Sequence, residues 1–430
     1  MNDKNLNALQ PPMGWNSWDC YAANVTEKQL LANAAYMQKY LLPFGWEYVV
    51  CDIQWYEPLA GTDEGEYRPF AELCMDEYSR LLPAENRFPS SVGGKGFAPI
   101  AEKIHNMGLK FGVHYMRGIP RQAAHRKTKI KGTKITAEKI ANPFSISKWN
   151  SDMYGVNSSH PHAQDYYNSI FELFASWGVD YVKVDDVCNT NMYPNAPYSG
   201  QGEIELMRKA IDNCGRPMVL SLSPGPALID KAWHLSRNAN MWRITDDFWD
   251  RWDLLKDMFN RCQLWQSFVK PGCWPDCDML PLGKIGVGFK SPRKSRFTKD
   301  EQRTMMTLWC IFRSPLMMGG VLPDNDKWTL SLLTNDEVLA VQKHGSNPLQ
   351  ITLNDNEAIW MNNAADGAVN LAIFNLSDKK RKISCPLIVL GFQNVLLRDL
   401  WNKKDMGSVK KEVVSEIPPH GCVLFRLTQK

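Results

Sequence analysis

The sequence predicts an α/β protein in which a closed (β/α)8 barrel is followed by a small antiparallel β domain. Over about three quarters of the chain, short apolar runs alternate with longer segments of helical periodicity, the pattern of βα units around a parallel sheet. Eight apolar runs take part, and eight βα repeats in a row favour a closed barrel over the alternative, an open doubly wound sheet. After about residue 340, alternation with a period of two indicates antiparallel strands. We therefore expect the barrel over residues 1–340 and the β domain over residues 341–430.

Each expected barrel strand is a short run of apolar residues bounded by turn-forming residues. In chain order the runs are Met13–Trp18, Tyr48–Trp55, Lys110–Met116, Asp180–Asp186, Pro217–Pro224, Asn240–Asp247, Gly272–Leu280 (the poorest match) and Pro315–Gly319. Helical periodicity predicts helices between them, over Glu27–Leu41, Pro99–Met107, Ala163–Trp177, Glu203–Asn213, Arg251–Gln263 and Thr298–Phe312. In the expected β domain, the alternating runs are Leu349–Leu353, Ala358–Met361, Val369–Phe374, Val395–Asp399 and Gly421–Leu427.

Two long insertions interrupt the barrel pattern, at Tyr56–Ala98 after the second strand and at Arg117–His162 after the third. Both follow the C-terminal ends of their strands, and loops at that end of a barrel build its active site. We therefore look for chemistry at the strand ends.

Composition narrows the classes of partner. The 430 residues carry a net charge of +4, too small an excess to indicate nucleic acid or an anionic membrane as the main partner. No apolar run approaches the length of a membrane span, and the first ten residues lack the apolar core of a secretion signal. The cysteines number eleven and are scattered, which suits reduced thiols. We expect a cytoplasmic protein, whose oligomeric state, including a homo-oligomer, the sequence leaves open.

The fourth expected strand ends in two acidic residues. In Tyr181-Val-Lys-Val-Asp185, the period of two places Lys183 and Asp185 on one face and the valines on the other, where they can pack under helices. The charged face then points into the barrel mouth. A neighbouring ammonium favours the ionised carboxylate that a nucleophile needs, although a buried ion pair without catalytic role has the same pattern.

The sixth expected strand repeats this arrangement, because Arg243, Thr245 and Asp247 share one face, which favours Asp247 over Asp246. Two inward carboxylates are what glycoside hydrolysis requires, one as nucleophile and one as general acid, and a separation of about 5–5.5 Å predicts retention of configuration. Aromatic faces pack against the apolar face of a sugar ring, although a single tryptophan is more often part of a core. Six tryptophans lie near these strand ends: Trp15, Trp18, Trp55, Trp149, Trp242 and Trp274.

These residues resemble the α-galactosidase (melibiase-type) family of glycoside hydrolases, which includes α-galactosidases, α-N-acetylgalactosaminidases and β-L-arabinopyranosidases. The likeness extends over essentially the whole chain. It rests on Pro12-Met-Gly-Trp-Asn-Ser-Trp18, on Tyr181-Val-Lys-Val-Asp185, on Arg243 followed by Asp247 and Trp252, and on Trp274-Pro-Asp-Cys-Asp278-Met279.

The resemblance implies a TIM barrel with a C-terminal β-sandwich, retaining exo-cleavage of a terminal sugar from an oligosaccharide or glycoside, and no metal or organic cofactor. It implies that Asp185 is the nucleophile and Asp247 the acid/base. It also implies a set of sugar-binding positions: Trp18, Asp52, Lys183, Arg243 and Asp278.

Departures from the family pattern bear on the substrate. α-Galactosidases usually carry two adjacent Asp residues after the second strand, whereas this chain has Asp52-Ile53. An apolar Ile53 cannot accept hydrogen bonds from hydroxyls near C4 and C6, which favours β-L-arabinopyranose, the sugar without the exocyclic group; the alternative is that another loop residue makes that contact. Ser223 is small and keeps a 2-acetamido sugar open. His114 and the insertion residue Trp149 indicate a remodelled, narrower entrance.

Two other classes of protein remain as alternatives. A non-catalytic carbohydrate-binding protein on the same scaffold would bind sugar without turnover, but both carboxylates are present. A metal-dependent hydrolase would need ligands at several strand ends, and of the eight histidines only His114 lies at one. The close pair Cys273 and Cys277 has a spacing compatible with zinc, but no second pair accompanies it.

Overall fold

The computed structural model describes residues 3–62, 67–189 and 195–430. Its centre is an eight-stranded parallel sheet with the order β10-β9-β8-β7-β3-β2-β1-β13. The strands are β1 (Met13–Asn16), β2 (Tyr48–Cys51), β3 (Lys110–Met116), β7 (Tyr181–Asp185), β8 (Val219–Leu222), β9 (Met241–Arg243), β10 (Trp274–Asp276) and β13 (Leu316–Met318). Leu280, just after β10, closes the sheet by forming a parallel bridge to Met318. The prediction of a barrel is confirmed, and each strand lies within its expected run.

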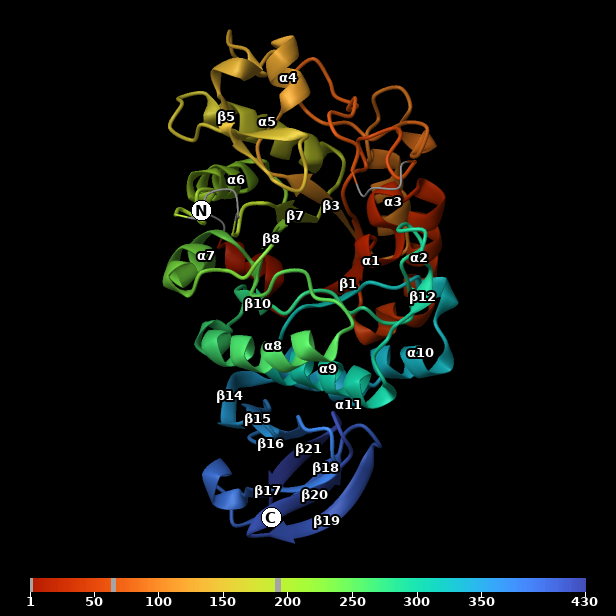
Figure 1. Cartoon of the computed structure of the whole chain (residues 1–430), viewed down its shortest axis with the longest axis vertical. Coiled ribbons are helices and arrows are strands. Elements are labelled where there is room, and N and C mark those ends of the chain that lie inside the picture. The colour runs from red at the N-terminus through yellow and green to blue at the C-terminus, as the bar shows by residue number, and fades with distance from the viewer. Residues whose placement is uncertain (1–2, 63–66, 190–194) are drawn as a thin grey trace.

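Helices surround this sheet (Figure 1). They are α1 (Trp18–Tyr21), α2 (Glu27–Tyr40), α3 (Ala98–Asn106), α5 (Ala163–Ser176), α6 (Gln201–Asn213), α7 (Ala232–Asn238), α8 (Trp252–Trp265), α9 (Lys299–Phe312), α10 (Lys327–Leu333) and α11 (Asp336–His344). The six predicted helices are present. The sequence analysis did not identify α7, which fills the step between β8 and β9, because its seven residues are too few to show helical periodicity.

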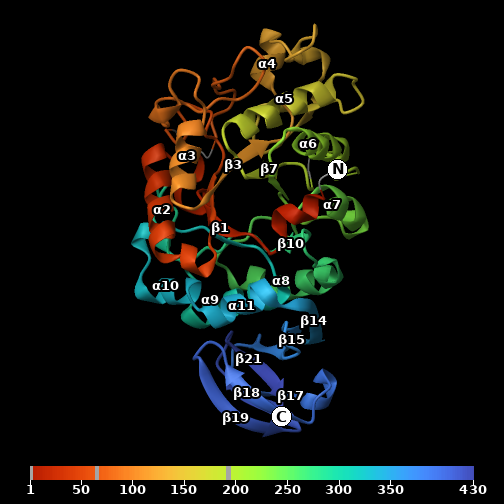
Figure 2. The same cartoon turned by 180° about the vertical axis from the view of Figure 1, so that it is seen from behind.

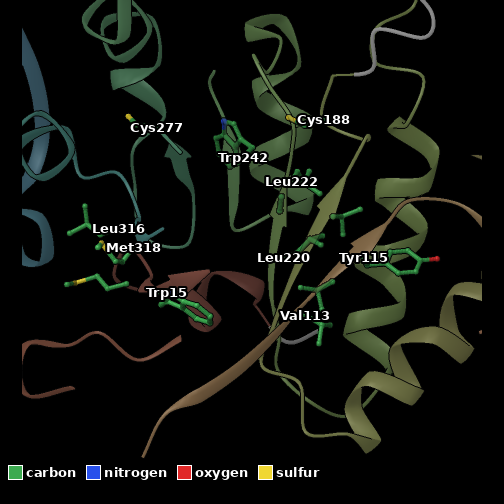
Figure 3. Packing of buried hydrophobic residues seen from close by; sticks show 14 of the residues in the cluster. Trp15, Val113, Tyr115, Cys188, Leu220, Leu222, Trp242, Cys277, Leu316 and Met318 are labelled. Atoms are coloured by element: carbon green, nitrogen blue, oxygen red, sulfur yellow. The ribbon is translucent and has the colours of Figure 1, made fainter. Parts of the chain in front are cut away.

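The period of two along the strands separates an inner face from an outer face. Val113, Leu220, Leu222 and Leu316 point outward and pack against the helices in the main apolar cluster, as Figure 3 shows. Residues of the opposite parity form a second cluster inside the barrel, together with Ala8 of the 3-10 segment Lys4–Ala8: Tyr48, Val50, Tyr181, Val219, Met241, Trp274 and Met317. This layer fills the lower part of the barrel, so the space for a ligand lies above it.

The insertions form small structures of their own. The second contains α4 (Arg121–Arg126) and a three-stranded sheet of β4 (Ile119–Pro120), β6 (Met153–Val156) and β5 (Ala141–Ile146). A hairpin of β11 (Lys284–Ile285) and β12 (Arg293–Lys294) follows the barrel's closing segment. In both views, the insertion with α4 lies at the end of the molecule opposite the C-terminal sheets (Figures 1 and 2).

The C-terminal part is a β-sandwich. A six-stranded antiparallel sheet contains β14 (Ser346–Leu353), β15 (Glu357–Asn363), β16 (Val369–Asn375), β21 (Cys422–Gln429), β18 (Asn394–Asp399) and β19 (Lys404–Lys410). A second sheet pairs β17 (Arg381–Pro386) with β20 (Glu412–Ile417), and both sheets contribute to one apolar core. The expected boundary at residue 340 falls inside α11, and the division of the chain at that point stays a prediction.

Candidate active site

A pocket of about 370 Å³ opens at the C-terminal ends of the barrel strands. Several of the side chains around it come from residues that end a strand or follow within two positions, as in Asp185 of β7, Arg243 of β9 and Asp52 after β2. Nine of the eleven site residues predicted from the sequence line the pocket: Trp18, Asp52, Ile53, Trp149, Lys183, Asp185, Arg243, Asp247 and Asp278.

Asp185 is held from three sides. Nε2 of His114 lies 2.8 Å from its Oδ2, the hydroxyl of Ser223 donates to its Oδ1, and Nζ of Lys183 lies 3.7 Å from Oδ2. Because an ionised carboxylate only accepts hydrogen bonds, the proton of this pair belongs on Nε2 of His114. Burial opposes ionisation, but Lys183 and His114 outweigh it and hold the pKa of Asp185 below its usual range. The side chain is 12% exposed, so a ligand in the pocket can reach an ionised carboxylate.

Lys183 links this carboxylate to Asp52. Its Nζ lies 2.9 Å from Oδ2 of Asp52, which also accepts a hydrogen bond of 2.7 Å from Asn16. Although burial opposes its charge, Asp185 and Asp52 raise the pKa of Lys183. Atoms of Asp52, His114 and Asp185 lie within 4.8 Å of one another, a spacing that could hold a metal ion. The ammonium of Lys183 already provides a positive charge beside both carboxylates.

Asp247 also lines the pocket, from the loop that follows β9. Arg243 bridges two carboxylates there, with Nη2 2.8 Å from Oδ1 of Asp247 and Nη1 2.8 Å from Oδ1 of Asp278. Asp247 is 59% exposed, far more than Asp185, so it is open to solvent and to a leaving group. Below them, burial and the nearby Asp278 raise the pKa of Asp276 to about 7.

Two predicted binding residues, His114 and Ser223, are not among the residues that line the pocket, and their role in sugar binding stays a prediction. His114 pairs in register with Lys183, one layer below the strand end, and its ring reaches Asp185 from beneath. Ser223 is buried and donates its hydroxyl to Asp185, while the next residue, Pro224, lines the pocket. Both residues therefore contact the carboxylate and lie beneath the pocket wall.

The tryptophans divide in the same way. Trp18 and Trp149 line the pocket, whereas four others are fully buried in the apolar core: Trp15, Trp55, Trp242 and Trp274. The interpretation of those four as sugar-stacking residues is wrong. Three of the four indoles donate to backbone carbonyls, Trp15 to Gly320, Trp55 to His114 and Trp274 to Ala8.

The sequence analysis missed other pocket residues, chiefly Tyr67 and Trp249. The ring of Tyr67 stacks on Trp18 with centroids 6.0 Å apart and contacts Trp149 at 5.5 Å, so the insertions bring an aromatic wall to the rim. Asp19, next to Trp18, was also missed. Its position directly after the expected strand Met13–Trp18 was a signal that could have identified it.

The cysteine pair does not form a zinc site. The thiol of Cys277 lies 3.5 Å from that of Cys262, whereas the thiol of Cys273 donates to the backbone oxygen of Ser236. In the described part of the chain, the cluster of potential metal ligands is the one around Asp52, and it contains no cysteine.

Comparisons with known proteins agree with this geometry. Residues 150–344 match the family model described as alpha galactosidase A, and residues 354–427 match the alpha galactosidase C-terminal beta sandwich domain. Among curated proteins, alpha-galactosidase 2 of Arabidopsis thaliana is 27% identical over 98% of this chain and 90% of its own length.

Solved structures are more similar. A β-L-arabinopyranosidase of glycoside hydrolase family 27 from Geobacillus stearothermophilus is 56% identical, with a TM-score of 0.96 over 99% of this chain and 98% of its own. A protein from Bacillus halodurans, provisionally assigned as an α-N-acetylgalactosaminidase, is 48% identical, with a TM-score of 0.88 over 98% of this chain and 97% of its own. With such identity across nearly the whole of both chains, this chain belongs to the α-galactosidase (melibiase-type) family of glycoside hydrolases.

Proposed function

We propose that this glycoside hydrolase removes terminal β-L-arabinopyranosyl residues, with Asp185 as nucleophile and Asp247 as acid/base. The choice of sugar rests on one observation: Ile53, which has a branched apolar side chain, lines the pocket next to Asp52. A hydroxymethyl group at this wall would meet no acceptor from Ile53. β-L-Arabinopyranose has the ring stereochemistry of α-D-galactopyranose without that group.

The Geobacillus enzyme supports this choice, because it is a β-L-arabinopyranosidase and a variant of it forms a complex with arabinose. That variant aligns with this chain at 55% identity and a TM-score of 0.96. An arabinopyranoside therefore stands as the first candidate substrate.

The proposed mechanism is a double displacement. Asp185 attacks the anomeric carbon and forms a glycosyl ester, while protonated Asp247 donates its proton to the oxygen of the departing aglycone. Asp247 then takes a proton from water, and the water oxygen attacks the anomeric carbon of the ester; the bond from that carbon to Asp185 breaks, which frees the carboxylate and releases the sugar with retained configuration. Three contacts support the first role, because Lys183, His114 and Ser223 all favour the ionised form of Asp185.

α-D-Galactosides are the second candidate, favoured by the many α-galactosidases among the curated relatives. An α-N-acetylgalactosaminide has less support from this site. A 2-acetamido group would need the space beside a small Ser223, and the residue that forms the pocket wall there is Pro224.

The cellular setting is also proposed. All eleven cysteines are free thiols, which supports a reducing, cytoplasmic compartment. None of the helices that the structure describes has the length and apolarity of a membrane span. We propose that the protein needs no metal or organic cofactor, since Lys183 and Arg243 supply the positive charge around the carboxylates.

The test is kcat/KM on the 4-nitrophenyl β-L-arabinopyranoside, α-D-galactopyranoside and α-N-acetylgalactosaminide. The proposal predicts the highest value for the arabinopyranoside. A higher value for either of the other two would show that a residue other than Ile53 sets the sugar preference.

A further inference from the structure

Asp19 is a pocket carboxyl that the proposed mechanism does not use. It lies on α1, directly after Trp18, and lines the pocket. Its side chain is directed toward Gly319, just after β13, because a Cβ atom on that glycine would overlap the carboxyl group. In the sheet, β1 lies between β13 and β2. Asp19 therefore lies in the part of the wall toward β13, whereas Ile53 follows β2 on the other side of β1.

Asp19 differs from the other carboxyl groups around the pocket in having no partner. Its Oδ2 is buried and finds no hydrogen-bond donor among the residues that the structure describes. The other six pocket carboxyls each accept at least one hydrogen bond: Asp52, Asp185, Asp186, Asp246, Asp247 and Asp278.

A buried carboxyl without a partner destabilises a protein, because it loses its hydrogen bonds to water and gains none in return. Such groups are rare in folded proteins, and those that persist tend to serve a ligand. Here the group lines the cavity that receives the sugar, and a sugar hydroxyl is the complementary partner.

We propose that Asp19 binds a hydroxyl group of the terminal sugar and is a specificity-determining residue of this enzyme. The inference rests on the proposed function, in which the pocket holds that sugar. Ile53 cannot accept a hydrogen bond from the sugar. Asp19 provides a carboxyl that can, from another part of the pocket wall.

The surroundings allow the carboxyl to act as donor as well as acceptor. Burial raises the pKa of Asp19 well above its usual value, and Asp278 and Asp247 raise it further, while Lys183 and Arg243 oppose them. A protonated carboxyl can donate to one oxygen and accept from another, which suits a sugar hydroxyl.

Gly319 offers a way to move the carboxyl without removing it. Its backbone does not adopt the left-handed conformation that disfavours other residues, and the three atoms nearest to a Cβ placed there all belong to Asp19. In Gly319→Ala the Asp19 carboxyl must move, together with its Cβ atom, which would lie 2.9 Å from the added methyl, while the number of ionisable groups in the protein stays the same.

The experiment compares Asp19→Ala, Asp19→Asn and Gly319→Ala with wild type, by calorimetric titration with free L-arabinose and by thermal unfolding without sugar. Asp230→Asn serves as the control, since its carboxyl is 71% exposed and Asp230 is not among the residues that line the pocket. We expect Asp19→Ala and Gly319→Ala each to raise the Kd for L-arabinose about fivefold or more. Their effects should not add in the double variant, because both act through one carboxyl.

The unfolding data separate binding from structure. If Asp19 serves the ligand, Tm of Asp19→Asn without sugar stays equal to that of wild type or rises, because Oδ2 of Asp19 makes no hydrogen bond in the described structure that the substitution could remove. A Kd within twofold of wild type in Asp19→Ala and Gly319→Ala would overturn the inference, as would a fall in Tm of Asp19→Asn with no change in its Kd. Turnover of glycosides by wild type tests the proposed function separately.

Discussion

Replacing Ile53 by aspartate tests the origin of the sugar preference. The backbone at this position is firmly held: the N–H of Ile53 donates to Oδ1 of Asp52 at 2.8 Å, and Arg87 donates to the carbonyl oxygen of Gln54 at 2.6 Å. Gln54 also donates to Asp152, which anchors the second insertion. We therefore expect Ile53→Asp to change the chemistry of the wall and leave its position unchanged.

The size of the effect follows from the hydrogen bond that Ile53 cannot form. A hydroxyl left unpaired against an apolar wall costs about 1–3 kcal/mol, which corresponds to a factor of roughly 5–150 in kcat/KM. The new carboxylate lies beside Asp52, and repulsion between them offsets part of the gain. We expect the ratio of kcat/KM for α-D-galactopyranoside over β-L-arabinopyranoside to rise about tenfold.

The assay measures kcat/KM for both 4-nitrophenyl glycosides in parallel. Ile53→Asn supplies an acceptor without charge, and Ile53→Val supplies space without an acceptor. We expect the ratio of kcat/KM for galactoside over arabinopyranoside to rise in Ile53→Asp, to rise less in Ile53→Asn and to change little in Ile53→Val. A ratio within twofold of wild type in Ile53→Asp, or an equal rise in Ile53→Val, would refute the hydrogen-bond argument.

Four further outcomes are expected. Asp185→Gly loses activity, and azide restores turnover of an activated aryl glycoside; an unimpaired variant contradicts the nucleophile assignment. His114→Gln raises the pKa of Asp185, so the acid limb of the kcat/KM profile moves to higher pH, and an unmoved limb argues against this coupling. Asp276 holds a proton in the folded state that the unfolded chain releases, since burial raises its pKa to about 7 from 3.8. Wild type therefore loses stability as pH rises from about 4 to 7, and Asp276→Asn should gain Tm relative to wild type over that window, with no gain if the group is ionised throughout. Exhaustive chelation leaves activity unchanged, and a loss that zinc or calcium reverses would show that the enzyme requires a metal.

The barrel could be predicted because its signals are local. Apolar strands such as Tyr48–Cys51 and Tyr181–Asp185 carry their pattern within a few residues, and βα repeats occur in one order. The helix α7 could not be predicted from the sequence, because Ala232–Asn238 is short and its packing against neighbouring elements decides its conformation. The pairing of β17 with β20 likewise joins segments distant in sequence.

The sequence predicted which face of each strand carries the site residues, but not how far each residue lies from the end of its strand. The period of two showed which side chains face the barrel interior, and it placed Lys183, Asp185 and Arg243 correctly in the pocket wall. It did not show the layer at which each residue lies. His114 and Trp274 have the inward parity but lie in lower layers, where one contacts a carboxylate and the other fills the core.

Trapping the covalent intermediate tests the central claim most directly. The protein is incubated with 2-deoxy-2-fluoro-β-L-arabinopyranosyl fluoride, digested and analysed by mass spectrometry. The account predicts one fluorosugar per chain, attached through an ester to Asp185. A label on Asp247 or another carboxylate, or turnover with no trapped ester and with inverted product, would contradict it.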